Sequence, residues 1–287
     1  MSRLTVLDSL SLPGRADKPN EDAMGMAGQV AFVLDGATGL GDTPLMPGPS
    51  DAAWVAQTAA EALARNAPGF AGDLDTIVYR AAKHIETEFA EKRVRADFAR
   101  YEIPWATLAM CGVTAGILNV AFLGDSRLIA RDAEGNLHHF GAPLKYRQSE
   151  QRLAQAMRAR AKGQVLGIES IRSTVLPELR AARERVNTPE GYWLMGPDAR
   201  SAAHVSKAEL RLSGSIMVLL MTDGFYALIE DYKRYTDATL IAAAVAKGLR
   251  ALGDELREIE SDDPFGERYP RMKQSDDATA MLVRVDA

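Results

Sequence analysis

The chain has 287 residues, of which 47% are hydrophobic and 25% are charged, a composition typical of a soluble globular protein with a large core. Its formal net charge is -5 and its basic residues are scattered, so neither nucleic acid nor an anionic membrane surface is an expected partner. The single cysteine, Cys111, lies in an apolar stretch and is expected to be a small buried hydrophobic residue, which leaves no role for an intrachain disulfide.

Targeting and membrane segments are not expected. The longest apolar run, residues 216–221 (IMVLLM), is too short to span a bilayer, and the N-terminal segment lacks the apolar core of a signal peptide. We therefore expect a cytoplasmic protein. Because no low-complexity linker or internal repeat interrupts the chain, we expect a single domain over residues 1–287, and we expect it to act as a monomer.

Strands and then helices are predicted in the first third of the chain. Leu4–Leu10 alternates in polarity like a strand, and Val30–Leu34 is a continuous apolar run of the kind found in a sheet covered on both faces. Ser50 can cap a helix through DAAWVAQTAAEALARNA, unless Asp51 does so. A second helix is predicted from about Leu74 to Arg93, so that two helices lie side by side.

The middle of the chain is predicted to change from regular strands to a weakly patterned segment. Residues 105–140 consist of apolar stretches separated by short turn signals, which predicts a meander of antiparallel strands. Residues 149–163 are basic and are predicted to be helical. Prolines punctuate the sequence from there onward, so we expect an irregular, flap-like segment at about residues 145–211.

The last part of the chain returns to strand, helix and strand. Ser215–Met221 is a predicted buried strand, one long helix is predicted from about Asp237 to Glu260, and residues 275–285 (SDDATAMLVRV) lead an acidic pair into a final strand. Hairpin-type connections favour mostly antiparallel sheets. The helix pairs then favour layers stacked as helix, sheet, sheet and helix.

Carboxylates recur at the ends of these predicted strands. Clustered carboxylates repel one another and raise their own pKa values unless a cation neutralises them. Hard oxygen ligands without a nearby histidine or cysteine favour Mg²⁺ or Mn²⁺ over zinc. Gly36 follows Asp35 directly and Gly224 follows Asp223, and each glycine would let a backbone carbonyl or a water approach the metal. The carboxylates concerned are Asp35, Asp125, Asp223, one or both of Asp276 and Asp277, and, closely after the first strand, Glu21 and Asp22.

Each of these residues also has an ordinary structural explanation. Asp-Gly pairs are common turn signals, Glu21 and Asp22 could lie in a solvated loop, and Asp125 could belong to a hairpin turn. His138 and His139 lie beside a turn signal and are expected to be surface residues of a strand rather than ligands.

The ordered set of motifs resembles the metal-dependent protein phosphatases, the PPM or type 2C serine/threonine family, in particular its short bacterial members. The resemblance covers nearly the whole chain. It implies the α+β class and a four-layer α-β-β-α sandwich, with two central antiparallel sheets flanked by helix pairs. It also implies a binuclear Mn²⁺ or Mg²⁺ site between the sheets. The motifs are NEDA at 20–23, VLDGATG at 33–39, GDSR at 124–127, MTDGF at 221–225 and SDDATAMLV at 275–283.

The resemblance assigns metal ligands by position. Asp35 would bridge the two metal ions, and the carbonyl of Gly36 would bind one of them. Asp223 and Asp276 would hold the other ion. Asp125 would correspond to the residue that helps bind a weaker third ion in similar enzymes. The implied reaction is in-line attack on phosphorus by a water that the cations acidify.

The resemblance also assigns the catalytic residues of the N-terminal loop. Glu21 and Asp22 would orient metal-bound waters. The family's phosphate-binding arginine lies four residues before the glutamate, where this chain has Asp17, so a neighbouring cation must replace it. We favour Arg15 over Lys18, because a guanidinium can hold two phosphoryl oxygens at once.

Three further departures from the family pattern are visible. Ala37 stands where animal members have a histidine that is thought to protonate the leaving group, so another residue or water must do so. Asp277 replaces the asparagine that commonly follows the last metal-binding aspartate. Residues 187–205 replace the segment that usually precedes the TDG strand, and specificity could differ most there.

The function expected from the sequence is hydrolysis of phosphoserine or phosphothreonine in a protein, with the target of a serine/threonine kinase as a possible substrate. Two alternatives stay open: a pseudophosphatase that keeps the fold as a binding or regulatory module, and a phosphatase that acts on a small phosphorylated metabolite. The clustered acids argue against the pseudophosphatase, because a binding module has no use for them.

Overall fold

The computed structural model describes residues 2–141 and 173–287. The helix predicted at residues 149–163 and the first part of the predicted flap-like segment lie outside the described residues. No helix within the described ranges combines the length and the apolar character needed to cross a bilayer.

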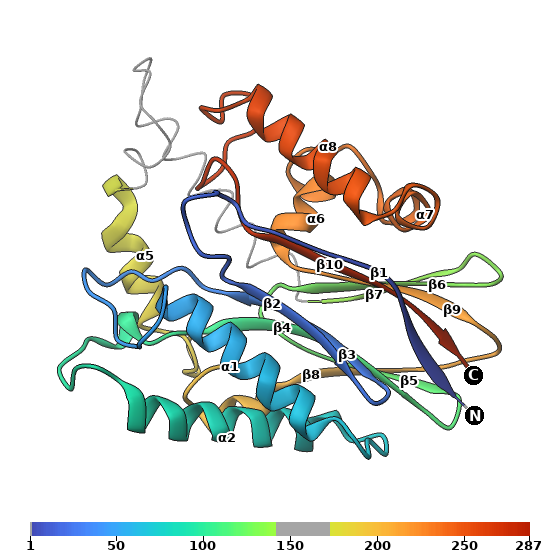
Figure 1. Ribbon diagram of the computed structural model, residues 1–287, viewed down its shortest axis with the longest axis horizontal. Coiled ribbons are helices and arrows are strands. Elements are labelled where there is room, and N and C mark those ends of the chain that lie inside the picture. Colours follow the sequence, from blue (N-terminus) through green and yellow to red (C-terminus); the bar gives the residue numbers. More distant parts are fainter. Residues whose placement is uncertain (1, 142–172) are drawn as a thin grey trace.

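Two five-stranded antiparallel sheets form the centre of the molecule and lie face to face (Figure 1). The strand order is β1-β10-β9-β6-β7 in one sheet, sheet A, and β2-β3-β4-β5-β8 in the other, sheet B. Sheet A consists of β1 (Arg3–Leu12), β10 (Ala278–Asp286), β9 (Ile216–Met221), β6 (Arg127–Asp132) and β7 (Leu137–Phe140). Sheet B consists of β2 (Asp22–Ala27), β3 (Val30–Gly36), β4 (Ala106–Thr114), β5 (Ile117–Leu123) and β8 (Ser206–Arg211).

Helices cover the outer face of each sheet, which confirms the predicted α-β-β-α sandwich (Figure 1). The helices α1 (Asp51–Asn66) and α2 (Leu74–Lys92) pack on sheet B. Ser50 is the residue that caps α1, because its hydroxyl accepts the backbone N–H of Ala53 at 3.0 Å. The other sheet is covered by α6 (Asp223–Glu230), α7 (Asp237–Lys247) and α8 (Leu249–Asp262).

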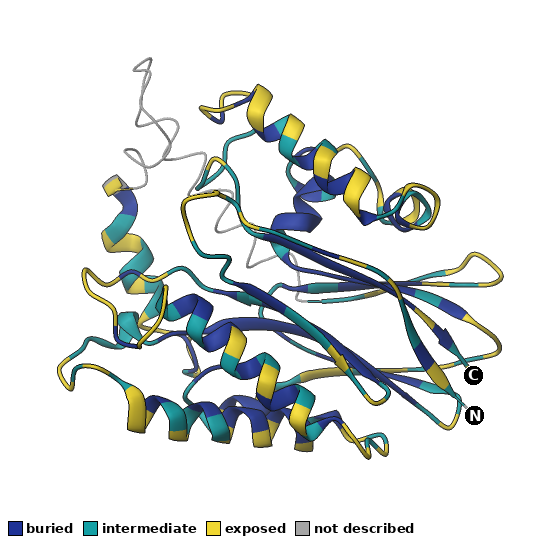
Figure 2. Cartoon of the chain, viewed as in Figure 1, coloured by how far each residue is buried: buried dark blue, intermediate teal, exposed yellow. Residues whose placement is uncertain are grey.

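Strand β3 is apolar from Val30 to Leu34, and both faces of this stretch are buried (Figure 2). Val30 and Phe32 pack against the helices of sheet B, whereas Ala31 and Val33 face the core between the two sheets. Cys111 lies in the same inter-sheet core, where burial raises the pKa of its thiol to about 12. It is a buried hydrophobic residue, as predicted.

The predicted single meander is wrong at its centre. Strands β4 and β5 form a hairpin in sheet B, and β6 and β7 form a hairpin in sheet A, so the chain crosses between the sheets at residues 124–126. Each hairpin by itself satisfies the local turn signals. Only the packing of the two sheets against each other separates the hairpins.

The single long helix predicted near the C-terminus is also wrong. It is interrupted at Gly248, whose φ of 81° lies in a region that glycine adopts without strain. The break turns the chain so that the backbone N–H of Leu249 donates to Asp8 Oδ2 on β1 at 2.7 Å. The second helix can then place Leu252 and Leu256 against sheet A.

Several short elements were not expected. Strand β2 is only six residues long and begins at Asp22, and helix α6 begins at Asp223, where the sequence indicated a turn. Within the described part of the segment predicted to be irregular, α5 (Leu176–Arg183) is helical, and β8 pairs with β5 at the edge of sheet B.

Candidate active site

Asp35 is the centre of a group of carboxylates between the two sheets. Its pKa is raised well above the ordinary value by burial and then by the charges of four other aspartates. They come from β2, from the crossing between the sheets, from the start of α6 and from the loop before β10. The structure thus brings together the aspartates that the sequence singled out. The four are Asp223, Asp22, Asp276 and Asp125.

Asp22 is a buried strand residue and not part of a solvated loop. Its side chain is 3% exposed, and it lies directly opposite Asp35 in the β2–β3 pair. Its Oδ2 accepts the hydroxyl of Thr222 at 2.9 Å, whereas its Oδ1 has no hydrogen-bond partner among the described residues. Burial raises the pKa of Asp22 well above its usual range, and the charges of Asp277 and Asp276 add to this effect.

The donor set fits a hard divalent cation. The residues that meet here offer carboxylate oxygens, one of them a buried acceptor without a protein donor in the described ranges. Positive charge would relieve the repulsion that raises the pKa values of Asp22 and Asp35. Within residues 2–141 and 173–287, no three histidine, cysteine, aspartate or glutamate side chains are already positioned around one common metal position.

A chain of hydrogen bonds joins the two sheets beside Asp22. The hydroxyl of Thr222, which follows β9, accepts the backbone N–H of Thr279 at 2.9 Å. The hydroxyl of Thr279 pairs with that of Ser11 at 2.7 Å, and Ser11 in turn accepts from Asn20 Nδ2 at 2.8 Å. The chain closes where the backbone N–H of Asp22 donates to Asn20 Oδ1 at 2.9 Å. The network fixes the start of β2 to the opposite sheet.

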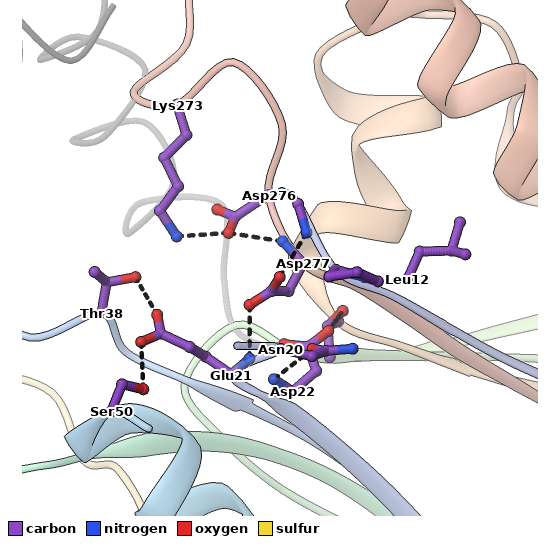
Figure 3. Close-up of polar contacts among 12 residues, drawn as sticks. Leu12, Asn20, Glu21, Asp22, Thr38, Ser50, Lys273, Asp276 and Asp277 are labelled. Atoms are coloured by element: carbon purple, nitrogen blue, oxygen red, sulfur yellow. Dashed lines mark hydrogen bonds and ion pairs between the residues drawn. The ribbon is translucent and has the colours of Figure 1, made fainter. Parts of the chain in front are cut away.

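Glu21 is held in place at both ends (Figure 3). Its Oε2 accepts the hydroxyl of Thr38 at 2.6 Å, and its Oε1 accepts that of Ser50 at 2.7 Å. Ser50 therefore caps α1 and fixes Glu21 at the same time. The backbone N–H of Glu21 donates to Asp277 Oδ2 at 2.7 Å.

Asp277, one of the residues that depart from the family pattern, holds the N-terminal loop in place. Besides the N–H of Glu21, it accepts the N–H of Gly14 at 2.6 Å through Oδ1 (Figure 3 shows its contact with Glu21). Both ends of the 14–21 loop are thereby tied to the loop before β10. Sequence reasoning identified Asp277 as a candidate metal ligand and as a departure from the family pattern, but not as an anchor of this loop, because its partners lie more than 250 residues away.

The glycines of the two Asp-Gly pairs pack closely against the backbone of other segments. A Cβ on Gly36 would lie 2.5 Å from the carbonyl oxygens of Ala52 and Glu21. A Cβ on Gly224 would lie 2.0 Å from the carbonyl oxygen of Asp277. At both positions there is no space for a side chain, so only glycine allows the backbone next to the aspartate to pack there.

Asp125 lies at the crossing between the sheets and not in a hairpin turn. The next residue, Ser126, is fully buried, and its hydroxyl pairs with that of Thr107 at 2.5 Å. Arg127 forms a largely buried ion pair with Glu230 at 2.8 Å and lies over the ring of Tyr226. The contacts of Ser126 with β4 and of Arg127 with α6 hold the neighbouring Asp125 close enough for its charge to act on Asp35.

The two cations predicted to bind phosphate lie on an exposed loop. Arg15 makes a two-point contact with Asp17, at 2.9 Å through Nε and 2.7 Å through Nη2. Its side chain is 44% exposed, and Lys18 is also exposed. A cation that sequence reasoning missed, Lys273, contacts the carboxylate group directly, because its Nζ lies 2.5 Å from Asp276 Oδ1.

The loop after Asp35 contacts helix α5. The guanidinium of Arg183 donates to the carbonyl oxygens of Ala37 and Thr38, each at 3.4 Å. Ala37, which stands where animal members of the family have a histidine, donates its backbone N–H to the carbonyl of Trp105 at 2.8 Å. His138 and His139 lie on β7, and the side chain of His139 is 54% exposed, as expected of a surface strand.

The fold is that of the metal-dependent phosphatases, and the family model described as protein phosphatase 2C matches residues 14–258. The chain belongs to this family. The resemblance seen in the sequence is thereby confirmed. A search of curated protein sequences finds no match.

Solved structures support the same fold. The catalytic domain of the serine/threonine protein phosphatase PstP, in complex with two manganese ions, is 17% identical, with a TM-score of 0.57 and full coverage of both chains. Mycobacterium tuberculosis PstP/Ppp is 14% identical with a TM-score of 0.58, covering 100% of this chain and 99% of that one. PppA of Pseudomonas aeruginosa is 18% identical with a TM-score of 0.55, covering 99% and 97%. The predicted cofactor class, Mn²⁺ or Mg²⁺, is confirmed at the level of the family.

Proposed function

We propose that this chain is a metal-dependent phosphoprotein phosphatase that hydrolyses phosphoserine and phosphothreonine. The main support is the convergence on Asp35 of four aspartates from separate parts of the chain. Such a group is costly to bury without cations, and a pair of divalent cations suits a phosphate monoester substrate.

The proposed metal ligands are those that the sequence indicated. Asp35 and the carbonyl of Gly36 are proposed to bind the ions together with Asp223 and Asp276, and Asp125 is proposed to help bind a third. The ions would neutralise charge on the phosphoryl oxygens and lower the pKa of the attacking water.

The remaining residues are proposed to orient water and substrate. Asp22 offers its Oδ1, and Glu21 is held rigidly by Thr38 and Ser50, so both can position water next to the metal ions. Arg15 stays a predicted phosphate ligand. Its contact with Asp17 would have to open for it to reach the substrate.

The named relatives support a protein substrate. PstP is a serine/threonine protein phosphatase, and PppA is described as a regulatory component of a T6SS. We propose a phosphoprotein, such as the target of a serine/threonine kinase, as the substrate. A monomeric state and a cytoplasmic location stay predictions.

The test is hydrolysis of p-nitrophenyl phosphate and of a phosphothreonine peptide, each with Mn²⁺ and with excess chelator. We expect turnover of both substrates that depends on Mn²⁺. Binding of Mn²⁺ without turnover of either substrate would favour a pseudophosphatase. Turnover of p-nitrophenyl phosphate but not of several phosphopeptides would favour a small phosphorylated metabolite.

A further inference from the structure

Lys273 is positioned over the carboxylates of the candidate site (Figure 3). Its Nζ contacts Asp276 Oδ1 at 2.5 Å, and its side chain is 29% exposed. The ammonium thus lies directly at the carboxylate of Asp276, one of the proposed metal ligands.

The loop that carries Lys273 is anchored on the side that precedes this residue. Asp263 accepts the backbone N–H groups of Glu267 at 2.8 Å and Tyr269 at 2.9 Å. Arg271 pairs with Asp263 at 2.8 Å and donates to the carbonyl of Gln274 at 2.8 Å. The backbone on that side of Lys273 is thus tied to the end of α8.

The side that follows Lys273 is anchored as well. Arg257 of α8 donates to the carbonyl of Asp276 at 2.8 Å and to those of Leu12 and Pro13 at 3.2 and 3.1 Å. With both sides fixed, the four-carbon side chain of Lys273 is the part that can move. A short swing of its ammonium needs no rearrangement of the backbone.

We propose that Lys273 binds the phosphoryl oxygens of the substrate, so that a phosphate-binding cation comes from the loop before β10 besides the predicted Arg15. This inference rests on the proposed function. Divalent cations that bind Asp276 and its neighbours would weaken the hold of those carboxylates on the ammonium. An anionic phosphoryl group placed at the same carboxylates would then be the strongest available partner for Lys273. Arg15, by contrast, is engaged with Asp17 on an exposed loop.

The test measures binding of inorganic phosphate to the full chain loaded with Mn²⁺, by equilibrium dialysis and by product inhibition. We expect Lys273→Met to raise the dissociation constant for phosphate about ten- to a hundredfold, as for the loss of a charge-assisted contact. Lys273→Arg should restore most of the affinity. The matched control is Lys207→Met, which breaks another Lys–Asp ion pair, that of Lys207 with Asp75. Lys207 lies on β8, three strands away from β3 in sheet B.

Titration with Mn²⁺ separates this role from a structural one. Loss of the ammonium should leave Mn²⁺ affinity unchanged or increase it, because a competing cation is removed from Asp276. The inference is overturned if Lys273→Met weakens Mn²⁺ binding as much as phosphate binding, or if phosphate binding is unchanged. It is also overturned if Arg15→Ala alone causes the loss.

Failure of the proposed function gives a different result. A wild-type chain that binds phosphate through Lys273 but hydrolyses no phosphomonoester would sink the proposed activity and keep this inference. Thermal unfolding of each variant, followed by circular dichroism, confirms that the variants are folded when the affinities are compared.

Discussion

Asp22 on β2 and Asp35 on β3 are direct cross-strand partners, so their carboxylates project from the same face of sheet B. Like charges placed opposite each other destabilise a sheet, and burial adds to the cost here. The fold therefore carries a destabilising pair at its centre that bound cations would stabilise.

The first prediction concerns metal binding by Asp35 and the aspartates around it. Mn²⁺ should raise the melting temperature of the wild type, since it binds the native state only. Asp35→Asn and Asp223→Asn should each lower kcat at least about a hundredfold at saturating Mn²⁺ and reduce the metal-induced rise. Asp132→Asn, at the end of β6, is the matched control and should retain activity. Near wild-type kcat for either site variant would show that the metal centre is misplaced.

The second prediction concerns the space around Gly36. Gly36→Ala should destabilise the protein by about 1–3 kcal/mol, because its Cβ would meet two backbone carbonyls that cannot move independently. Gly39→Ala, three residues away, has open space for a Cβ and should change stability by less than about 0.5 kcal/mol. Urea denaturation of both variants measures the difference. Equal stability of the two variants would contradict the close contact.

The third prediction concerns Asp277. Asp277→Ala removes the acceptors of the N–H groups of Gly14 and Glu21, and should cost about 1–3 kcal/mol of unfolding free energy. Because the loop also positions Glu21, kcat/KM should fall with stability. Asp277→Asn keeps one accepting oxygen and should lose less. If Asp277→Ala left both kcat/KM and stability unchanged, Asp277 would not be what fastens the loop.

The fourth prediction is a pH dependence at Asp263. Burial raises the pKa of Asp263, but the N–H groups of Tyr269 and Arg268 and the contact with Arg271 lower it by more, so the net shift is downward. Its stabilising contribution is therefore full above the unfolded pKa and is lost as the pH falls through the lower folded pKa. Asp263→Asn should cost about 1.5–3 kcal/mol at pH 7 and progressively less below about pH 4.

Urea denaturation between pH 3 and pH 7 measures this dependence. The control is Asp262→Asn, which changes the exposed neighbouring residue. A difference between Asp263→Asn and wild type that stays constant over the whole range would show that the charge of Asp263 does not stabilise the loop.

Local sequence determined the strands other than β2 and β8, the first two helices and the identity of the acidic residues. Val30–Gly36 is a buried strand because its apolar run can cover two cores at once, and Ser50 caps α1 through contacts within four residues. Such features depend on neighbours in the chain, and periodicity and capping report them directly. The aspartates at strand ends were visible for the same reason.

Tertiary structure decided what depends on distant partners. The crossing between β5 and β6 follows from sheet packing, and the short strand β2 is stabilised by its pairing with β3. Asp277 is bound by Gly14 and Glu21, which approach it only in the folded chain, and only the fold brings Asp276, the partner of Lys273, near the other aspartates. Charges and hydrogen bonds act through space, so a residue whose partners are far away in sequence leaves no local pattern from which its role can be predicted.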